Sequence, residues 1–141
     1  MIYLDYNATS PIAPEVADAM RPFLTGGYGN PSSAHPPGRE ARAAVDAARA
    51  KVAALIGARP REIIFTSGGT EADNLAILGT LAANPTKKNL ALSAVEHPAV
   101  FTLGERLAGE GYRVTFVPVD AAGALDCESL KNEVSAETAL V

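Results

Sequence analysis

EIIFTSGGTEADNLAI, residues 62–77, changes its hydrophobic period halfway along. Residues 63–65 (Ile-Ile-Phe) form a short apolar run rich in β-formers, which is typical of a strand covered on both faces. The apolar residues after the two glycines are spaced by three and four, as in a helix; they are Ala72, Leu75, Leu78 and Ala82. We therefore expect a buried strand, a sharp turn on Gly68 and Gly69, and a helix that begins at once.

The turn has the features of a phosphate site. Gly68 and Gly69 can adopt positive φ and let a ligand approach the backbone, and Thr70 can cap the helix while its hydroxyl remains free to donate. A helix start also offers unpaired N–H groups and the positive end of the helix dipole. The P-loop and dinucleotide fingerprints are absent and Glu71 disfavours a polyphosphate, so a single phosphate monoester fits better. A β–α turn without a ligand is the structural alternative.

Length and composition restrict the class of protein. The chain has 141 residues and a net charge of −4 without a basic cluster, which indicates one domain and supports neither nucleic acid nor an anionic membrane as a partner. Its single cysteine, Cys127, allows no internal disulfide and favours a reducing compartment. Because there is no basic leader and no apolar run that could span a bilayer, we expect a soluble cytoplasmic protein. We expect no metal site.

Strand and helix alternate along the rest of the chain. Four helices are expected. The first begins at Pro14 and is limited by Pro22, and the second begins at Arg39 and ends at Gly57. The third begins at Pro98 and the fourth at Asp126. The expected strands lie at 89–94, 112–119 and 138–141. Residues 25–38 alternate glycines and prolines with short polar residues, and a loop of this length is usually functional or disordered. The alternation of strand and helix predicts an α/β fold, a mostly parallel sheet with flanking helices.

Two candidate site motifs follow neighbouring strands of that sheet. The turn at Gly69 and Thr70 follows one expected strand, and His97 follows the next. Ligands of such sheets bind beyond the carboxyl ends of the strands, so we expect both motifs to share one crevice. A histidine that only forms structural hydrogen bonds is the alternative for His97.

Four segments in order resemble the cysteine desulfurases, pyridoxal-phosphate (PLP) enzymes of the class V aminotransferase group. They are YLDYNATSP at 3–11, GNPSSAH at 29–35, FTSGGTEADN at 65–74 and EHPAV at 96–100. The similarity covers essentially the whole chain and is more specific for the group than for one member. It implies fold type I, with residues 1–12 as an arm that belongs to the small domain and residues 13–141 as the first part of the PLP-binding large domain. It also implies that the loop at residues 25–38 is ordered and functional.

The resemblance also implies an activity. Such enzymes remove sulfur from L-cysteine, leaving L-alanine and an enzyme persulfide for iron–sulfur cluster assembly or tRNA thiolation. Gly69 and Thr70 would bind the PLP phosphate, and His97 would lie over the pyridine ring and help to move protons. The residues that would approach the substrate are Asn7, Ala8 and Thr9. A sulfur-acceptor or scaffold protein and, for the full-length enzyme, a homodimer are further implied partners.

The covalent chemistry of this family needs groups that the sequence does not supply in the expected setting. These groups are a lysine that binds PLP, an acidic partner for the pyridinium nitrogen and a nucleophilic thiolate. The lysines, none in the family's Ser-x-His-Lys context, are Lys51, Lys87, Lys88 and Lys131. Cys127 does not match the family's nucleophile position. We therefore expect the N-terminal portion of a roughly threefold longer enzyme, inactive alone. The alternatives are a selenocysteine lyase or other class V enzyme, including a cysteine-sulfinate-type enzyme, and a non-catalytic fragment or interaction module.

Overall fold

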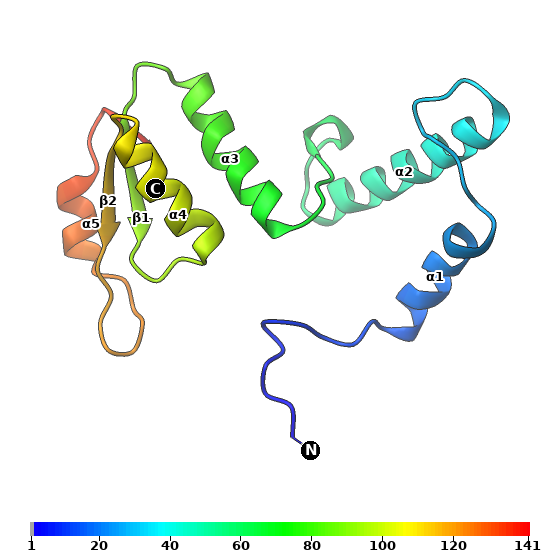
Figure 1. Cartoon of the computed structure of the whole chain (residues 1–141), viewed down its shortest axis with the longest axis horizontal. Coiled ribbons are helices and arrows are strands. Elements are labelled where there is room, and N and C mark those ends of the chain that lie inside the picture. Colours follow the sequence, from blue (N-terminus) through cyan, green and yellow to red (C-terminus); the bar gives the residue numbers. More distant parts are fainter. Residues whose placement is uncertain (1) are drawn as a thin grey trace. The chain divides into compact units, whose positions relative to one another are not determined.

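The structure is a computed structural model that describes residues 2–141; Met1, the first residue of the expected arm, lies outside the described residues. The chain divides into two compact units, Met1–Ile64 and Phe65–Val141, and each is described by itself. Figure 1 labels most of the helices and strands, which are numbered in chain order. No helix within residues 2–141 combines the length and the apolar character that crossing a bilayer requires.

The first unit contains the helices α1 (Pro14–Thr25) and α2 (Pro36–Leu55) and the short 3₁₀ helix η1 (Pro60–Glu62). The expectation that Pro22 limits the first helix is wrong, because α1 continues to Thr25. A proline removes only its own N–H, and the carbonyl of Pro22 still accepts from the N–H groups of Gly26 and Gly27, at 3.1 and 2.7 Å. These two bonds close the last turn of the helix.

The second helix begins three residues before the expected Arg39. Nδ1 of His35 accepts from the N–H of Gly38 at 3.2 Å and so caps α2, whose first residues are prolines. The loop that precedes it is packed closely against this helix start. A Cβ atom on Gly38 would lie 2.4 Å from the carbonyl oxygen of Ser33, so only glycine fits. Gly57, at φ +68°, follows the helix end as expected.

The expectation of a strand at residues 63–65 is wrong. These residues are extended, but they pair with no strand in residues 2–141, and Ile64 and Phe65 are 68% and 48% exposed. The guanidinium of Arg49 donates to the carbonyl of Ile63, so that this carbonyl is already engaged. A β-forming sequence becomes a strand only when a neighbouring strand supplies hydrogen bonds, and no strand of the described chain pairs with this segment.

The second unit is a three-stranded parallel sheet with helices on both sides. Its elements are α3 (Gly69–Ala83), β1 (Asn89–Ser93), α4 (Pro98–Gly109), β2 (Arg113–Val117), α5 (Cys127–Glu133) and β3 (Thr138–Leu140). The strand order is β2-β1-β3, and both pairs are parallel, with Leu90 opposite Val114 and Leu140. The expected α/β fold with a parallel sheet and flanking helices is therefore confirmed.

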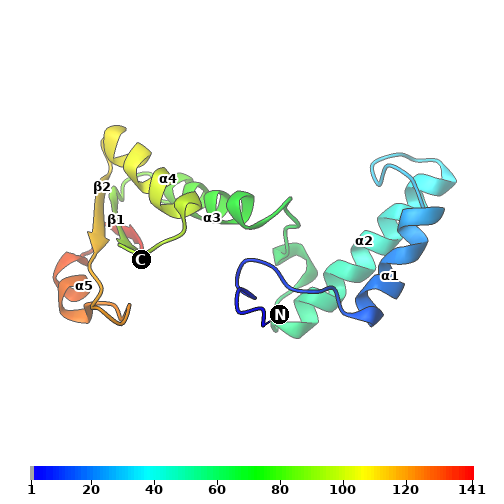
Figure 2. The ribbon, with the colours of Figure 1, turned by 60° about the horizontal axis from the view of Figure 1, so that its bottom comes forward.

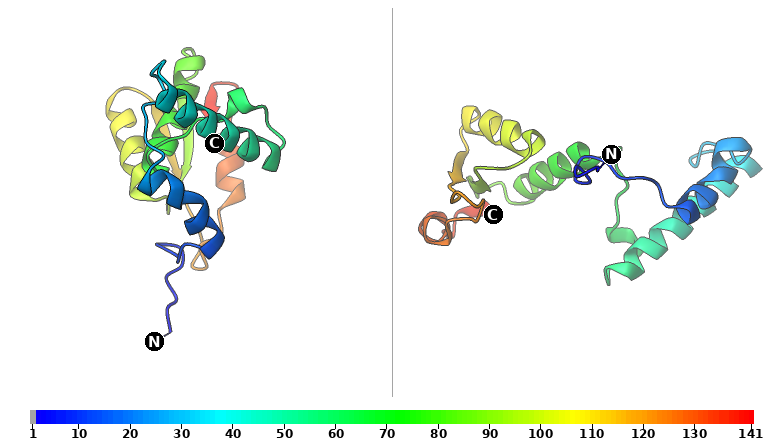
Figure 3. Two further views of the ribbon diagram at one scale, coloured as in Figure 1. Left: turned by 90° about the vertical axis from the view of Figure 1, so that its right-hand side faces the viewer. Right: turned by 90° about the horizontal axis from the view of Figure 1, so that it is seen from below.

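Successive side chains of β2 point to opposite faces of the sheet, as in any strand, and a different helix lies on each face. Arg113 and Thr115 contact Glu133 of α5 at 2.8 and 2.9 Å, whereas Val114 and Phe116 face α4. Figures 2 and 3 show α4 and α5 on opposite sides of this strand. The sheet therefore separates the packing of α3 and α4 from that of α5.

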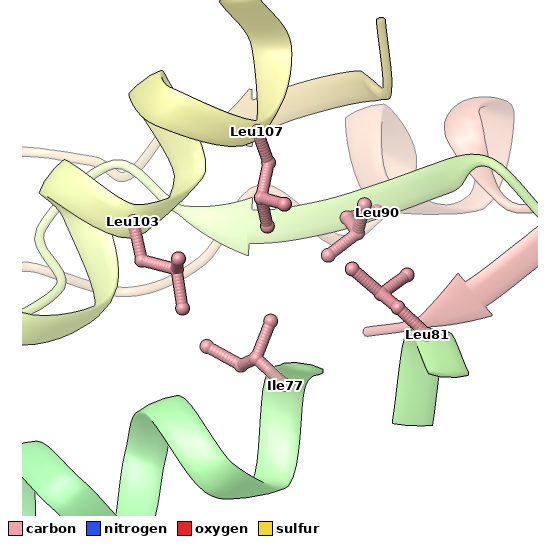
Figure 4. Packing of buried hydrophobic residues seen from close by; sticks show 5 residues of the cluster. All are labelled: Ile77, Leu81, Leu90, Leu103 and Leu107. Carbon is pink, nitrogen blue, oxygen red and sulfur yellow. The ribbon is translucent and has the colours of Figure 1, made fainter. Parts of the chain in front are cut away.

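The core lies between α3, α4 and β1, where five buried side chains meet (Figure 4): Ile77, Leu81, Leu90, Leu103 and Leu107. The expected helix is confirmed, but the spaced apolar residues on which it was predicted do not form its buried face: Ala72, Leu75, Leu78 and Ala82 are all exposed, Leu75 and Leu78 by 45% and 38%. Two stripes of this helix have helical spacing, and α4 with the sheet covers only the stripe that contains Ile77 and Leu81.

Candidate functional site

The start of α3 leaves backbone donors unpaired. Gly68 is the N-cap residue and no side chain caps the helix, so the expectation that Thr70 caps it is wrong. Thr70 is instead the second helical residue. The N–H groups of Gly69 and Thr70 donate to no acceptor within residues 2–141. Orphan donors of this kind, at the positive end of a helix, favour an anion.

The two glycines leave open space beside these donors. Gly68 has φ 165°, which is extended backbone, and positive φ occurs only at other glycines of the described chain, so the expected positive φ of Gly68 and Gly69 is wrong. A Cβ atom on either residue would meet nothing within 4 Å. Their contribution is therefore room for a ligand to approach the backbone.

Glu71 holds the entry to α3 in place. Its carboxylate accepts from the hydroxyl and the N–H of Ser67, at 2.7 and 2.6 Å. These bonds stabilise the charged form and lower the pKa of Glu71 below its ordinary value of about 4.5. Glu71 is not among the lining residues of the hollow described below. Its carboxylate binds Ser67 instead.

Replacing Ser67 by alanine is expected to raise the pKa of Glu71 toward 4.5, because the hydroxyl donor is lost. A lowered folded-state pKa stabilises the fold above the unfolded value and loses this contribution as the pH falls through the folded value. The acid side of the stability profile should therefore shift to higher pH in Ser67→Ala. A ¹³C NMR titration of the Glu71 carboxylate measures this, with Glu128 as control; an unchanged Glu71 pKa would contradict the assigned cause.

His97 is the N-cap residue of α4. Its Nδ1 accepts from the N–H of Ala99 at 3.1 Å, and Pro98 occupies the first helical position. In the neutral ring the proton is therefore on Nε2, which remains available because His97 is exposed. His35 caps α2 in the same way. A His-Pro dipeptide marks both caps in the sequence, and it is the signal from which they could have been predicted.

Thr70 and His97 line one open hollow of 490 Å³. Its other lining residues come from α3 and α4 and are Asn74, Pro98, Ala99, Thr102, Leu103 and Arg106. Asn74, Thr102 and Arg106 were not predicted as site residues, although Asn74 and Arg106 each lie four residues after a threonine that lines the hollow, on the same helix face.

The charge of the hollow is compatible with an anion. Arg106 is the one arginine, lysine, aspartate or glutamate among its lining residues within the described chain. Arg106 forms an ion pair with Glu110 at 3.4 Å, and both side chains of this pair are exposed. Such a pair is weak and leaves the guanidinium available to a ligand. Within residues 2–141, no three or more His, Cys, Asp or Glu side chains are grouped so that they could hold a metal ion.

The remaining predicted site residues belong to the first unit. Asn7, Ala8 and Thr9 are exposed and form a turn in which the carbonyl of Asp5 accepts from Ala8 and Thr9, at 3.1 and 3.4 Å. Their expected place near a substrate stays a prediction. Cys127 is exposed at the start of α5.

Comparisons with known proteins cover the whole described chain. The family model described as aminotransferase class-V matches residues 2–141. A cysteine desulfurase of Trichormus azollae is 48% identical over 141 residues, which are 100% of this chain and 35% of the relative. The structure of a NifS-like protein aligns with a TM-score of 0.85 at 36% identity, over 94% of this chain and 36% of that protein. A structure described as SspA in complex with cysteine aligns with a TM-score of 0.85 at 35% identity, over 96% and 40% of the two chains. The chain thus spans little more than a third of the length of these relatives.

Proposed function

Because the chain belongs to the aminotransferase class-V family, a PLP-dependent group, we propose that the hollow between Thr70 and His97 is part of the PLP site of a cysteine desulfurase. One observation carries this proposal: unpaired N–H donors and an imidazole, from two different helix starts, lie at the same hollow. Backbone donors suit a phosphate, and a ring suits an aromatic cofactor.

The phosphate half of the site is the start of α3. The N–H groups of Gly69 and Thr70 and the Thr70 hydroxyl supply three donors, and no Cβ atom obstructs the approach at Gly68 and Gly69. Because α3 has 15 residues, its dipole adds a favourable field for one phosphate monoester. These features fit the phosphate of PLP.

The ring half of the site is His97 at the start of α4. The hydrogen bond from the N–H of Ala99 to Nδ1 fixes the orientation of the imidazole, so that its face is presented in one direction. Nε2 then carries a proton that can be donated to a ligand atom and recovered. When it is bound, PLP supplies an electron sink for reactions at the α-carbon of an amino acid. The chain's own residues bind and orient it.

The activity of the whole protein is part of this proposal. We propose that it converts L-cysteine and an enzyme thiol to L-alanine and an enzyme persulfide, for transfer to a sulfur-acceptor or scaffold protein in iron–sulfur cluster assembly or thiolation. The names of the relatives support cysteine as the substrate, and so does the structural neighbour that is described as a complex with cysteine. A homodimer is proposed for the full-length form, as the family resemblance implies.

Three lysines belong to the unit of residues 65–141, and none of them lines the hollow: Lys87, Lys88 and Lys131. Lys51 belongs to the first unit and, like the other three, lacks the family's Ser-x-His-Lys context. Lys88 lies 4.5 Å from the centre of the Tyr112 ring, and Lys131 pairs with Glu128 at 2.8 Å. We therefore propose that these 141 residues bind PLP reversibly, without a covalent bond to a lysine.

Replacing Thr70 by valine is expected to weaken PLP binding by about tenfold to a hundredfold, because a hydrogen bond to a charged group typically contributes about 1.5–3 kcal/mol. Valine keeps the shape of threonine and removes only the hydroxyl. Absorbance and amide-shift titrations of the 141-residue chain with PLP measure the affinity. Thr80→Val, in the same helix but outside the hollow, is the matched control and should bind PLP like the unaltered chain.

Binding of pyridoxal, which lacks the phosphate, tests the ring half of the site without the phosphate half. The affinity of pyridoxal should be the same for the unaltered chain and for Thr70→Val, because the lost donor serves the phosphate. If the unaltered chain bound PLP no better than pyridoxal, or shifted no amide signal at Gly69 and Thr70, the proposed site would be wrong. A non-catalytic interaction module would then be the better description.

A further inference from the structure

Asn74 connects the two helix starts that form the proposed site. Its Nδ2 donates to the carbonyl of Thr70 at 2.8 Å, one turn back in α3, and to the carbonyl of Ala99 at 3.2 Å, in the first turn of α4. A side-chain amide has two N–H donors, so both bonds form together. Asn74 is half-buried and lines the hollow itself. One side chain thus joins the turn at Thr70 to the turn that His97 caps.

The apolar contacts between the same helices are centred farther along them, although Leu103 also lines the hollow. Figure 4 shows Ile77 of α3 facing Leu103 and Leu107 of α4. These side chains are about one turn or more beyond Asn74 and Ala99 along their helices. The bond from Asn74 to Ala99 is, within residues 2–141, the side-chain hydrogen bond that holds the two helix starts together. Hydrophobic packing has no preferred direction, whereas this hydrogen bond fixes the distance between two specific atoms.

We propose that Asn74 is a positioning residue, which sets the separation between the phosphate-binding turn at Gly69 and Thr70 and the imidazole of His97. This inference rests on the proposed function. A ligand that contacts both helix starts benefits from a fixed separation, because its second contact is then made without further ordering of the protein. A ligand that contacts only the turn gains nothing from it.

Asn84 provides a matched control in the same segment. Its Nδ2 donates to the carbonyl of Thr80 at 2.9 Å, which is the same bond to the residue four positions earlier that Asn74 makes to Thr70. Asn84 is also half-buried, but it makes no hydrogen bond to α4 within the described chain and does not line the hollow. The two residues therefore share the bond within the segment but differ in the contact between helices, which is the feature under test, and in lining the hollow.

The experiment compares Asn74→Leu and Asn84→Leu in the 141-residue chain. Leucine has the branched shape of asparagine, lacks its hydrogen-bonding groups and adds no charge near the phosphate. We expect Asn74→Leu to bind PLP about tenfold more weakly, as for the loss of one well-placed hydrogen bond in a preorganised site, and Asn84→Leu to bind it normally. Inorganic phosphate, which needs only the turn, should bind equally well to both variants and to the unaltered chain.

Two further measurements complete the test. Two-dimensional amide NMR spectra establish that each variant is folded, and Asn74→Gln, which retains the amide donor, should recover part of the PLP affinity. PLP binding by Asn74→Leu as tight as by Asn84→Leu, or an equal loss of PLP and phosphate affinity, would overturn the positioning role. Absence of PLP binding by the unaltered chain would instead overturn the proposed function, and this inference with it.

Discussion

Replacing Leu107 by alanine is expected to destabilise the unit of residues 65–141 by about 3 kcal/mol. Leu107 is 2% exposed and belongs to the cluster in which α4 contacts α3 and β1. The loss combines the transfer of the removed methyl groups to water with the cavity that remains, because a close-packed core relaxes only in part. Urea unfolding followed by circular dichroism measures the change in the free energy of unfolding.

Leu75→Ala is the matched control for this prediction. Leu75 is also a leucine in a helix of the same unit, but its side chain is 45% exposed and lies outside the buried cluster. Its replacement should change stability by no more than about 0.5 kcal/mol, as at most surface positions. Equal losses for both variants would show that the cluster around Leu107 is not the core. The difference between the two variants also tests which stripes of α3 and α4 are buried. The position of the hollow depends on how these two helices pack.

The elements that the sequence predicts well are those with a local cause. β1, α4 and β2 follow from short apolar runs, a proline at a helix start and glycines at a helix end, and all three formed within a few residues of the expected bounds. Gly111, at φ +93°, and Gly123, at φ +84°, occur where the chain turns. Such signals need no knowledge of distant residues.

The errors have causes outside the local sequence. Residues 63–65 have the composition of a strand, but pairing depends on a partner that local pattern does not reveal. Helical spacing fits Leu75 as well as Ile77, and only the position of α4 and the sheet decides which is buried. The residue Asn74 shows the same limit for the site: its helix position is predictable, but its bond to Ala99 joins residues 25 positions apart.

Replacing Gly104 by alanine is expected to destabilise the same unit, whereas alanine at Gly79 should stabilise it by about 1 kcal/mol. Both glycines lie inside helices, α4 and α3, where alanine is intrinsically favoured. A Cβ atom on Gly79 would meet nothing within 4 Å, but on Gly104 it would lie 2.7 Å from Cδ1 of Leu92 and 3.0 Å from Cζ of Phe116. Leu92 is 6% exposed, so it has little room to move.

The difference between the two variants isolates the clash at Gly104, because the gain in helix propensity is common to both. We expect this difference to be about 1–3 kcal/mol in urea unfolding, the usual cost of one excess methyl group in a packed core. Phe116 is stacked on Phe101, with ring centres 4.4 Å apart, and therefore resists displacement. If both variants were stabilised equally, α4 could not lie as close to β1 and β2 as it does, and the place of His97 at the start of that helix would lose its support.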